Sequence, residues 1–219
     1  MLKTAMLLAA GRGERLKPFT LTHPKALYPI DGTPLIEHHV IRLASIGYTR
    51  IVINHAYLGG QIRAHLGHGA RFDVEIIYTP EPPGGLETGG GLYNALPWLQ
   101  AEPFLTINAD ILTDYPFETI KAPSPHQAHV VLVPTPAYKK QSDFGLDGAS
   151  YATNEAPSLT FSGIASCHPS CFNACQPGRY SVTPLLRQWA TQKKLSGEIY
   201  HGLWRDVGVM SSNDGNTNF

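Results

Sequence analysis

The chain has no long apolar run, no excess of charge of either sign, and few cysteines. No stretch approaches the roughly 18 apolar residues that a membrane helix needs. Lys plus Arg number 17, as do Asp plus Glu, so no overall field draws the protein to nucleic acid or to an anionic membrane. Any anion site must therefore be local. We expect a cytoplasmic protein with neither nucleic acid nor membrane as a partner.

The three cysteines are Cys167, Cys171 and Cys175. They are spaced four apart near His168, as metal ligands on one helical face would be. Pro169 opposes a helix at that point, and the chain has no paired Cys-x-x-Cys. Partly buried, reduced thiols are the favoured interpretation, with a metal site as the alternative. The cysteines are given no part in the mechanism.

A glycine-rich loop follows the first apolar run, which covers residues 6–10 and predicts a buried strand. The glycines and cations of this loop, with a proline-fixed lysine further on, are Gly11, Gly13, Arg12, Arg15 and Lys25. Glycine lets backbone amides approach phosphate oxygens, and the cations add charge-assisted hydrogen bonds. A dinucleotide fingerprint would need glycine at Leu16, and a P-loop would need Ser or Thr at Pro18. The loop predicts a polyphosphate site of another kind, with a charged surface loop as the alternative.

Strands and helices alternate along the first half of the chain. Predicted helices cover residues 34–46, 58–66 and 90–99, and predicted strands cover residues 51–53, 74–78 and 104–107. Such alternation needs crossover connections, and therefore a mainly parallel sheet with helices on both faces. Further on, we expect strands over residues 130–133, 159–166 and 199–203, and a helix over residues 183–194.

The end of the chain has a different composition. From Val207 onward the residues are mostly polar and typical of turns, so they offer little apolar surface to bury. At 219 residues, with 42% hydrophobic and 16% charged content, the chain suits one globular domain. We predict a single domain over residues 1–208 and a disordered polar tail over residues 209–219.

Two aspartates follow predicted strands, where ligands bind in folds of this class. Asp110 comes after the strand over residues 104–107, and Asp206 follows another short apolar stretch. Carboxylates suit Mg²⁺, a hard cation that prefers oxygen ligands, and two of them facing one phosphate can share the metal. The alternative for each aspartate is a role in a turn or at a helix cap.

The segment over residues 80–91 is first rigid and then flexible. It contains three prolines, then Gly84 and Gly85, and then three glycines at the start of a helix. Glycines let backbone groups read a planar base edge at close range. Because each glycine inside a helix costs up to about 1 kcal/mol, a plain connecting loop does not explain them. The segment predicts a loop that reads a nucleotide base.

The motif Leu-Ala-Ala-Gly-x-Gly-x-Arg-x-x-Pro-x-Thr, followed by Pro-Lys, resembles the signature of the sugar-1-phosphate nucleotidyltransferases. Within that family the chain is most similar to uridylyltransferases acting on N-acetylmuramate 1-phosphate. The segments that carry this similarity are residues 53–56, 86–91, 161–164 and 204–208. The resemblance spans residues 3–208. It implies a three-layer α/β/α, Rossmann-like fold of the glycosyltransferase-A type, with a mainly parallel mixed sheet.

The resemblance also implies an enzyme with small-molecule substrates. A sugar 1-phosphate oxygen attacks the α-phosphorus of a nucleoside triphosphate and expels pyrophosphate, with Mg²⁺ as the cofactor. The leading hypothesis is transfer of UMP from UTP to N-acetylmuramic acid 1-phosphate, with mannose-1-phosphate guanylyltransferase or glucose-1-phosphate thymidylyltransferase activity as alternatives. A nucleotide-binding regulatory module without turnover is an alternative of another class. We expect a monomer or a small homo-oligomer.

The resemblance assigns roles to residues at matching positions. Those that would hold the triphosphate or stabilise the reacting phosphorus and pyrophosphate are Gly11, Arg12, Gly13, Arg15 and Lys25. Those that would frame the uracil are Glu81, Thr88 and Gly89. Asp110 and Asp206 would hold Mg²⁺, and Asp110 would act with Arg15 and Lys25 as the catalytic group. Those that would meet the sugar are Asn108, Asp143 and Gly145.

Overall fold

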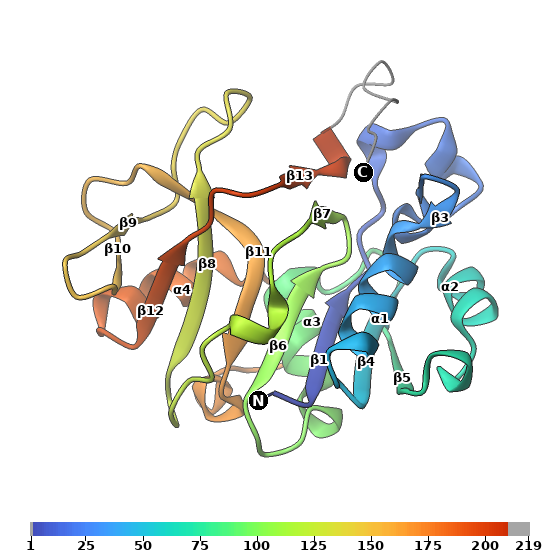
Figure 1. Cartoon of the computed structure of the whole chain (residues 1–219), viewed down its shortest axis with the longest axis horizontal. Coiled ribbons are helices and arrows are strands. Elements are labelled where there is room, and N and C mark those ends of the chain that lie inside the picture. Colours follow the sequence, from blue (N-terminus) through green and yellow to red (C-terminus); the bar gives the residue numbers. More distant parts are fainter. Residues whose placement is uncertain (1, 210–219) are drawn as a thin grey trace.

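The centre of the molecule is a seven-stranded sheet. The computed structural model describes residues 2–209, and the sheet has the strand order β12-β8-β11-β6-β1-β4-β5 (Figure 1). The strands are β1 Thr4–Leu8, β4 Arg50–His55, β5 Glu75–Pro80, β6 Phe104–Asn108, β8 Ala128–Pro134, β11 Leu159–Cys167 and β12 Leu195–Ile199. All are parallel except β11, which is antiparallel to both of its neighbours. The predicted mainly parallel mixed sheet is confirmed.

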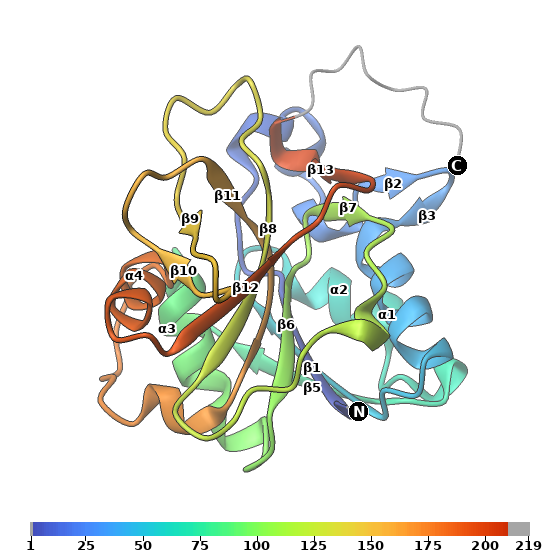
Figure 2. The same ribbon diagram turned by 60° about the vertical axis from the view of Figure 1, so that its left-hand side comes forward.

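Helices cover both faces of the sheet (Figure 2). They are α1 Leu35–Ser45, α2 Gly59–Leu66, α3 Glu87–Ala95 and α4 Thr183–Thr191. Side chains of a strand alternate between the two faces. Accordingly, Ala5 and Leu7 of β1 pack in the core beneath α1 and α2, whereas Met6 packs in the core beneath α3 and α4. The result is the predicted three-layer α/β/α arrangement.

Six short strands form three small two-stranded sheets beside the main one. They are β2 Pro29–Ile30 with β3 Thr33–Pro34, β7 Ile111–Thr113 with β13 Trp204–Asp206, and β9 Gly145–Leu146 with β10 Ala152–Thr153. The antiparallel pairing of β7 with β13 sets Asp206 opposite Ile111. Because Ile111 directly follows Asp110, this pairing brings the two predicted metal ligands together.

The predicted boundaries of three elements are wrong. The last sheet strand is β12, Leu195–Ile199, and not residues 199–203. Ser196 and Glu198 made this segment look polar, yet β12 pairs parallel with β8 and buries Leu195 and Gly197. Helix α3 begins at Glu87, so the glycines predicted to open it lie inside its first turns, and α4 ends at Thr191 rather than at residue 194.

The chain after Asp206 is also more ordered than its composition suggests. Val207–Val209 forms a short 3₁₀ helix, and Val207 is fully buried beside Leu16 and Leu112. The remainder of the predicted tail, residues 210–219, lies outside the described residues. Among the helices of residues 2–209, none is both long and apolar enough to cross a membrane.

Candidate active site

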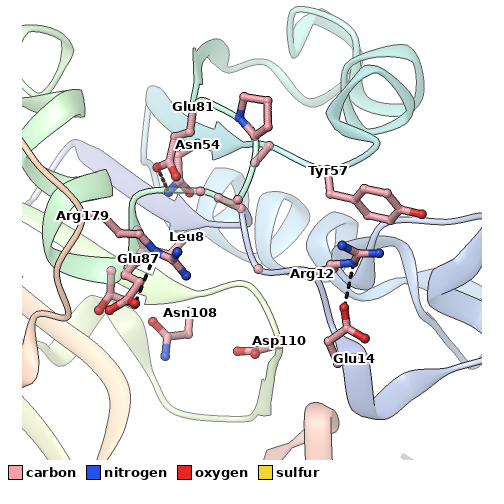
Figure 3. Close-up of a pocket in the computed structure, with 17 residues that line it drawn as sticks. Leu8, Arg12, Glu14, Asn54, Tyr57, Glu81, Glu87, Asn108, Asp110 and Arg179 are labelled. Atoms are coloured by element: carbon pink, nitrogen blue, oxygen red, sulfur yellow. Dashed lines mark hydrogen bonds and ion pairs between the residues drawn. The ribbon is translucent and has the colours of Figure 1, made fainter.

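A cavity of about 820 Å³ opens beyond the carboxyl ends of β1, β4, β5 and β6 (Figure 3). Predicted site residues that line it are Gly11, Arg12, Glu81, Thr88, Asn108 and Asp110. The other lining residues are Leu8, Ala10, Glu14, Asn54, Ala56, Tyr57 and Arg179, together with Pro83, Gly84, Gly85 and Glu87 of the segment predicted to read the base. Two segments supply most of this lining: the phosphate loop, residues 9–17, and the base loop, residues 81–88.

Gly13 does not line the cavity, but its backbone conformation shapes the phosphate loop. Its φ is +69°, and a Cβ at this position would lie 2.8 Å from the Cβ of Lys25. The carbonyl of Gly13 accepts hydrogen bonds from the Leu16 amide at 2.9 Å and from the Thr20 hydroxyl at 2.8 Å. Only a residue without a Cβ lets Lys25 pack this closely against the loop.

The two arginines of the phosphate loop are exposed. The Arg12 guanidinium lies 2.7 Å from the Glu14 carboxylate and 5.0 Å from the ring centroid of Tyr57, at one end of the cavity (Figure 3). Within residues 2–209, Arg15 makes no ion pair, and its charge acts on Asp206 across the site. Both cations are therefore accessible to a phosphate.

Asp110, Asp206 and Lys25 form a charged cluster beside the phosphate loop. The Lys25 ammonium contacts the Asp110 carboxylate and lies 3.8 Å from Oδ1 of Asp206, which also accepts a 2.8 Å hydrogen bond from the Gly208 amide. Burial raises the pKa of Asp206, and the Asp110 carboxylate raises it further, whereas Lys25 and Arg15 act in the opposite sense. Two carboxylates this close to each other in a partly buried site repel one another unless a cation lies between them.

This cluster fits a magnesium ion. Mg²⁺ in phosphate-transfer sites is bound by one or two carboxylates, with substrate phosphates and waters completing the shell. Across residues 2–209, no group of three or more His, Cys, Asp or Glu side chains could hold a metal by itself. Asp110 and Asp206 are thus a pair of ligands suited to a metal that the substrate also binds.

A buried hydrogen-bond network anchors the base loop. The Asn54 amide donates to Oε1 of Glu81 at 2.6 Å, and Oε2 of Glu81 accepts from the Leu86 amide at 2.6 Å. Burial raises the pKa of Glu81, while the hydrogen bonds from Leu86 and Asn54 act against that rise. The sequence placed Asn54 at a strand end but could not reveal its partner.

The start of α3 is tied to the segment before α4. The amides of Gly89 and Gly90 both donate to the carbonyl of Tyr180, at 2.9 and 3.0 Å, and the Thr88 hydroxyl accepts from the Val182 amide at 2.9 Å. A Cβ on Gly89 would lie 2.6 Å from the Tyr180 ring. Gly89 therefore serves close packing, and its amide is already occupied, whereas Thr88 also faces the cavity.

The predicted sugar-binding residues do not all reach the cavity. Asn108 lines it, and the side chain of Asn108 lies against Gly163, where a Cβ would be only 2.7 Å from Nδ2. Asp143 and Gly145 are absent from its lining. The Asp143 carboxylate instead contacts Lys139 and accepts a 3.0 Å hydrogen bond from the Phe161 amide.

The cysteines lie apart from the cavity, and all three are free thiols. Burial raises the pKa of the fully buried Cys167 far above its ordinary value, and raises the pKa of Cys171 to about 11. Neither thiol is activated as a nucleophile, because the thiolate is the reactive form.

Residues 4–156 match the family model described as nucleotidyl transferase. The chain belongs to this family. An N-acetylmuramate alpha-1-phosphate uridylyltransferase from Neisseria meningitidis serogroup B is 44% identical to it, over 94% of this chain and 93% of the relative. A protein of the same name from Caulobacter vibrioides is 29% identical, over 94% of this chain and 92% of the relative.

Among solved structures, a putative glucose-1-phosphate thymidylyltransferase from Bacillus anthracis superposes with a TM-score of 0.81 at 20% identity, covering 99% of this chain and 96% of that one. This likeness confirms the fold. The family match and the 44% identical relative confirm that this nucleotidyl transferase is a sugar-1-phosphate nucleotidyltransferase, as its opening motif indicated.

Proposed function

We propose that this nucleotidyl transferase moves UMP from UTP to N-acetylmuramic acid 1-phosphate, giving UDP-N-acetylmuramic acid and pyrophosphate. The observation that carries the proposal is the convergence of Asp110, Asp206 and Lys25 beside a cavity shared by a phosphate loop and a base loop. The 44% identical relative, matched over nearly its whole length, supports the choice of base and sugar. A cytoplasmic location is part of the proposal.

In this mechanism the protein positions the reactants and neutralises charge. Phosphoryl-group transfer needs little covalent chemistry from the enzyme, and catalysis comes mainly from alignment and electrostatic stabilisation. Gly11 and Arg12 line the cavity and hold the triphosphate, and the exposed Arg15 stabilises the charge on the departing pyrophosphate. Lys25, held beside both carboxylates, donates to a phosphate oxygen.

Asp110 and Asp206 would hold Mg²⁺, which supplies positive charge to the phosphate oxygens when bound. In the base loop, Glu81 and the backbone of Gly84 and Gly85 frame the uracil, while Thr88 and Gly89 fix the start of α3 behind it. Asn108 meets the sugar from the end of β6. Asp143 and Gly145 lie outside the cavity lining, where Asp143 contacts Lys139 and the Phe161 amide and Gly145 pairs with Thr153.

A panel of substrates tests the function. Pyrophosphate release is measured with UTP, CTP, GTP and dTTP, each combined with the 1-phosphates of N-acetylmuramic acid, mannose and glucose. We expect UTP with N-acetylmuramic acid 1-phosphate to give the highest kcat/KM. Preference for GTP with mannose 1-phosphate, or for dTTP with glucose 1-phosphate, would overturn the proposal. Nucleotide binding without pyrophosphate release in any combination would identify a regulatory module.

A further inference from the structure

Asn54 lies between the phosphate loop and the base loop, at the carboxyl end of β4. Its Oδ1 accepts a 2.8 Å hydrogen bond from the amide of Ala9, the first residue of the phosphate loop. Its Nδ2 donates to Glu81, which in turn accepts from Leu86 in the base loop. Three consecutive hydrogen bonds therefore join one loop to the other through a single carboxamide.

These three hydrogen bonds, the bridge between the two loops, are largely buried at the wall of the cavity. Asn54 is 2% exposed and Glu81 is 9% exposed, and Figure 3 shows the two side chains directed at each other. A Cβ at Gly91 would lie 2.6 Å from both Nδ2 of Asn54 and Oε1 of Glu81, so the backbone of α3 covers the bridge closely. Buried polar groups keep their partners because water cannot replace them there.

The bridge also brings the two loops into direct proximity. A Cβ at Gly85 of the base loop would lie 3.4 Å from Oε2 of Glu81 and 3.7 Å from the carbonyl of Ala10 in the phosphate loop. Both Gly85 and Ala10 line the cavity. A shift in the Asn54 carboxamide would therefore move the surface that meets the base and the surface that meets the phosphates together.

We propose that Asn54 is a positioning residue that couples base recognition to alignment of the α-phosphate. It touches no reacting atom and acts through Ala9 on one side and Glu81 on the other. Binding of the correct base fixes the position of the base loop. The hydrogen bonds of Asn54 with Ala9 and Glu81 then fix the position of the phosphate loop relative to it. This inference rests on the proposed function for the identity of its substrates. Its test, however, uses the ratio of kcat/KM between two nucleotides, whichever nucleotide the protein prefers.

Only a carboxamide serves both sides of the bridge. Asn54→Asp keeps the acceptor for the Ala9 amide but sets a second carboxylate against Glu81, where like charges repel. Glu81→Gln then restores a donor: the new amide nitrogen can donate to the carboxylate at position 54, and the amide oxygen can accept from Leu86. Asn54→Asp combined with Glu81→Gln therefore rebuilds all three hydrogen bonds with the donor on the opposite side.

The experiment compares Asn54→Asp, Glu81→Gln and the double variant with the wild type. Steady-state kinetics give kcat and KM for the preferred nucleotide and for the next best one, and thermal unfolding gives Tm. We expect Asn54→Asp to lower kcat/KM for the preferred nucleotide by about 10- to 100-fold, the scale of a misplaced reactant. The ratio of the two kcat/KM values falls as well, and the double variant recovers most of both losses.

Thr79→Val is the matched control. Thr79 pairs with Asn54 in the register of β5 with β4 and is 2% exposed. Within the described part of the chain, its hydroxyl has no hydrogen-bond partner. Its replacement should leave kcat/KM and the nucleotide ratio unchanged. If Asn54→Asp does not fold, Asn54→Ser removes the bridge without adding a charge and takes its place.

A lower Tm with an unchanged nucleotide ratio would overturn the coupling and leave Asn54 a structural residue. A double variant no better than Asn54→Asp alone would overturn it too. If the wild type prefers a nucleotide other than UTP, the proposed function fails, while the ratio between its preferred and next-best nucleotides still decides the role of Asn54.

Discussion

The ammonium of Lys25 lies 3.8 Å from Oδ1 of Asp206, while it also contacts the carboxylate of Asp110. One cation thus lies beside two carboxylates from distant parts of the chain, in a position where its own side chain is only 12% exposed. The phosphate loop packs against the Lys25 side chain at Gly13. The proposed phosphate site and the proposed metal site therefore share the same few residues.

Lys25→Met tests whether the Lys25 ammonium offsets the repulsion between the Asp110 and Asp206 carboxylates. Without the ammonium, Asp110 and Asp206 repel each other in a partly buried position, so we expect a loss of about 1 to 3 kcal/mol of stability. Added Mg²⁺ should raise the Tm of this variant more than that of the wild type, because the metal replaces the missing charge. The exposed Lys121→Met is the control. Equal Mg²⁺ responses in all three proteins would contradict the account.

Gly13→Ala tests the close approach of the phosphate loop to Lys25. A Cβ there would lie 2.8 Å from that of Lys25, on a backbone with φ of +69°. We expect a loss of about 1 to 2 kcal/mol, seen as a lower Tm, together with reduced pyrophosphate release. At Gly60 of α2, no described atom beyond the helix's own backbone and the two chain neighbours lies within 4 Å of a new Cβ. Gly60→Ala should therefore raise stability by up to about 1 kcal/mol. Equal stabilities of the two variants would argue against a packed loop.

The buried side chain of His39 should make the stability of the folded protein depend on pH. It is 2% exposed, and burial, with a smaller contribution from Arg42, lowers its pKa from 6.5 to about 4. Between pH 6.5 and about 4 the imidazole of His39 is protonated in the unfolded chain but stays neutral in the folded protein. The free energy of unfolding therefore decreases as pH falls from about 6.5 towards 4, by up to about 1.4 kcal/mol per pH unit. Urea unfolding at pH 7 and pH 4.5 measures this loss.

His39→Leu should reduce that loss, since leucine does not titrate, whereas the exposed His201→Gln should leave it unchanged. The comparison concerns the difference in unfolding free energy between the two pH values, so a uniform loss of stability in a variant does not affect it. An identical pH dependence in His39→Leu and the wild type would show that other groups govern the acid response.

The phosphate loop could be located in the sequence because its chemistry is local. A strand, two glycines and nearby cations are contiguous, and Gly11 and Arg12 line the cavity, while their contact with phosphate stays a prediction. The neighbouring positions of Asp110 and Asp206 depend on β7 and β13, three-residue strands too short to show periodicity. Their positions after apolar stretches suggested that they could share a metal, and the family resemblance implied it, but the pairing that joins them could not be read from the sequence.

Other parts of the site depend on contacts between residues far apart in the sequence, which no local sequence pattern predicts. Asn54 and Glu81 each follow a predicted strand, but their 2.6 Å hydrogen bond arises from the parallel pairing of β4 with β5. Gly89 was predicted to frame the uracil, but its amide donates to the carbonyl of Tyr180, a residue from a distant segment. In β12, the polar Ser196 and Glu198 concealed a strand that only its pairing with β8 reveals.

Mg²⁺-dependent pyrophosphate release by Asp110→Asn tests the central claim most directly. The substitution keeps the shape of the side chain but removes the charge that contacts Lys25 and that would bind the proposed Mg²⁺. With UTP and N-acetylmuramic acid 1-phosphate, we expect kcat to fall by at least about 100-fold while Tm stays near the wild-type value, and the exposed Asp73→Asn to retain full activity. Wild-type turnover in a folded Asp110→Asn protein would contradict the account.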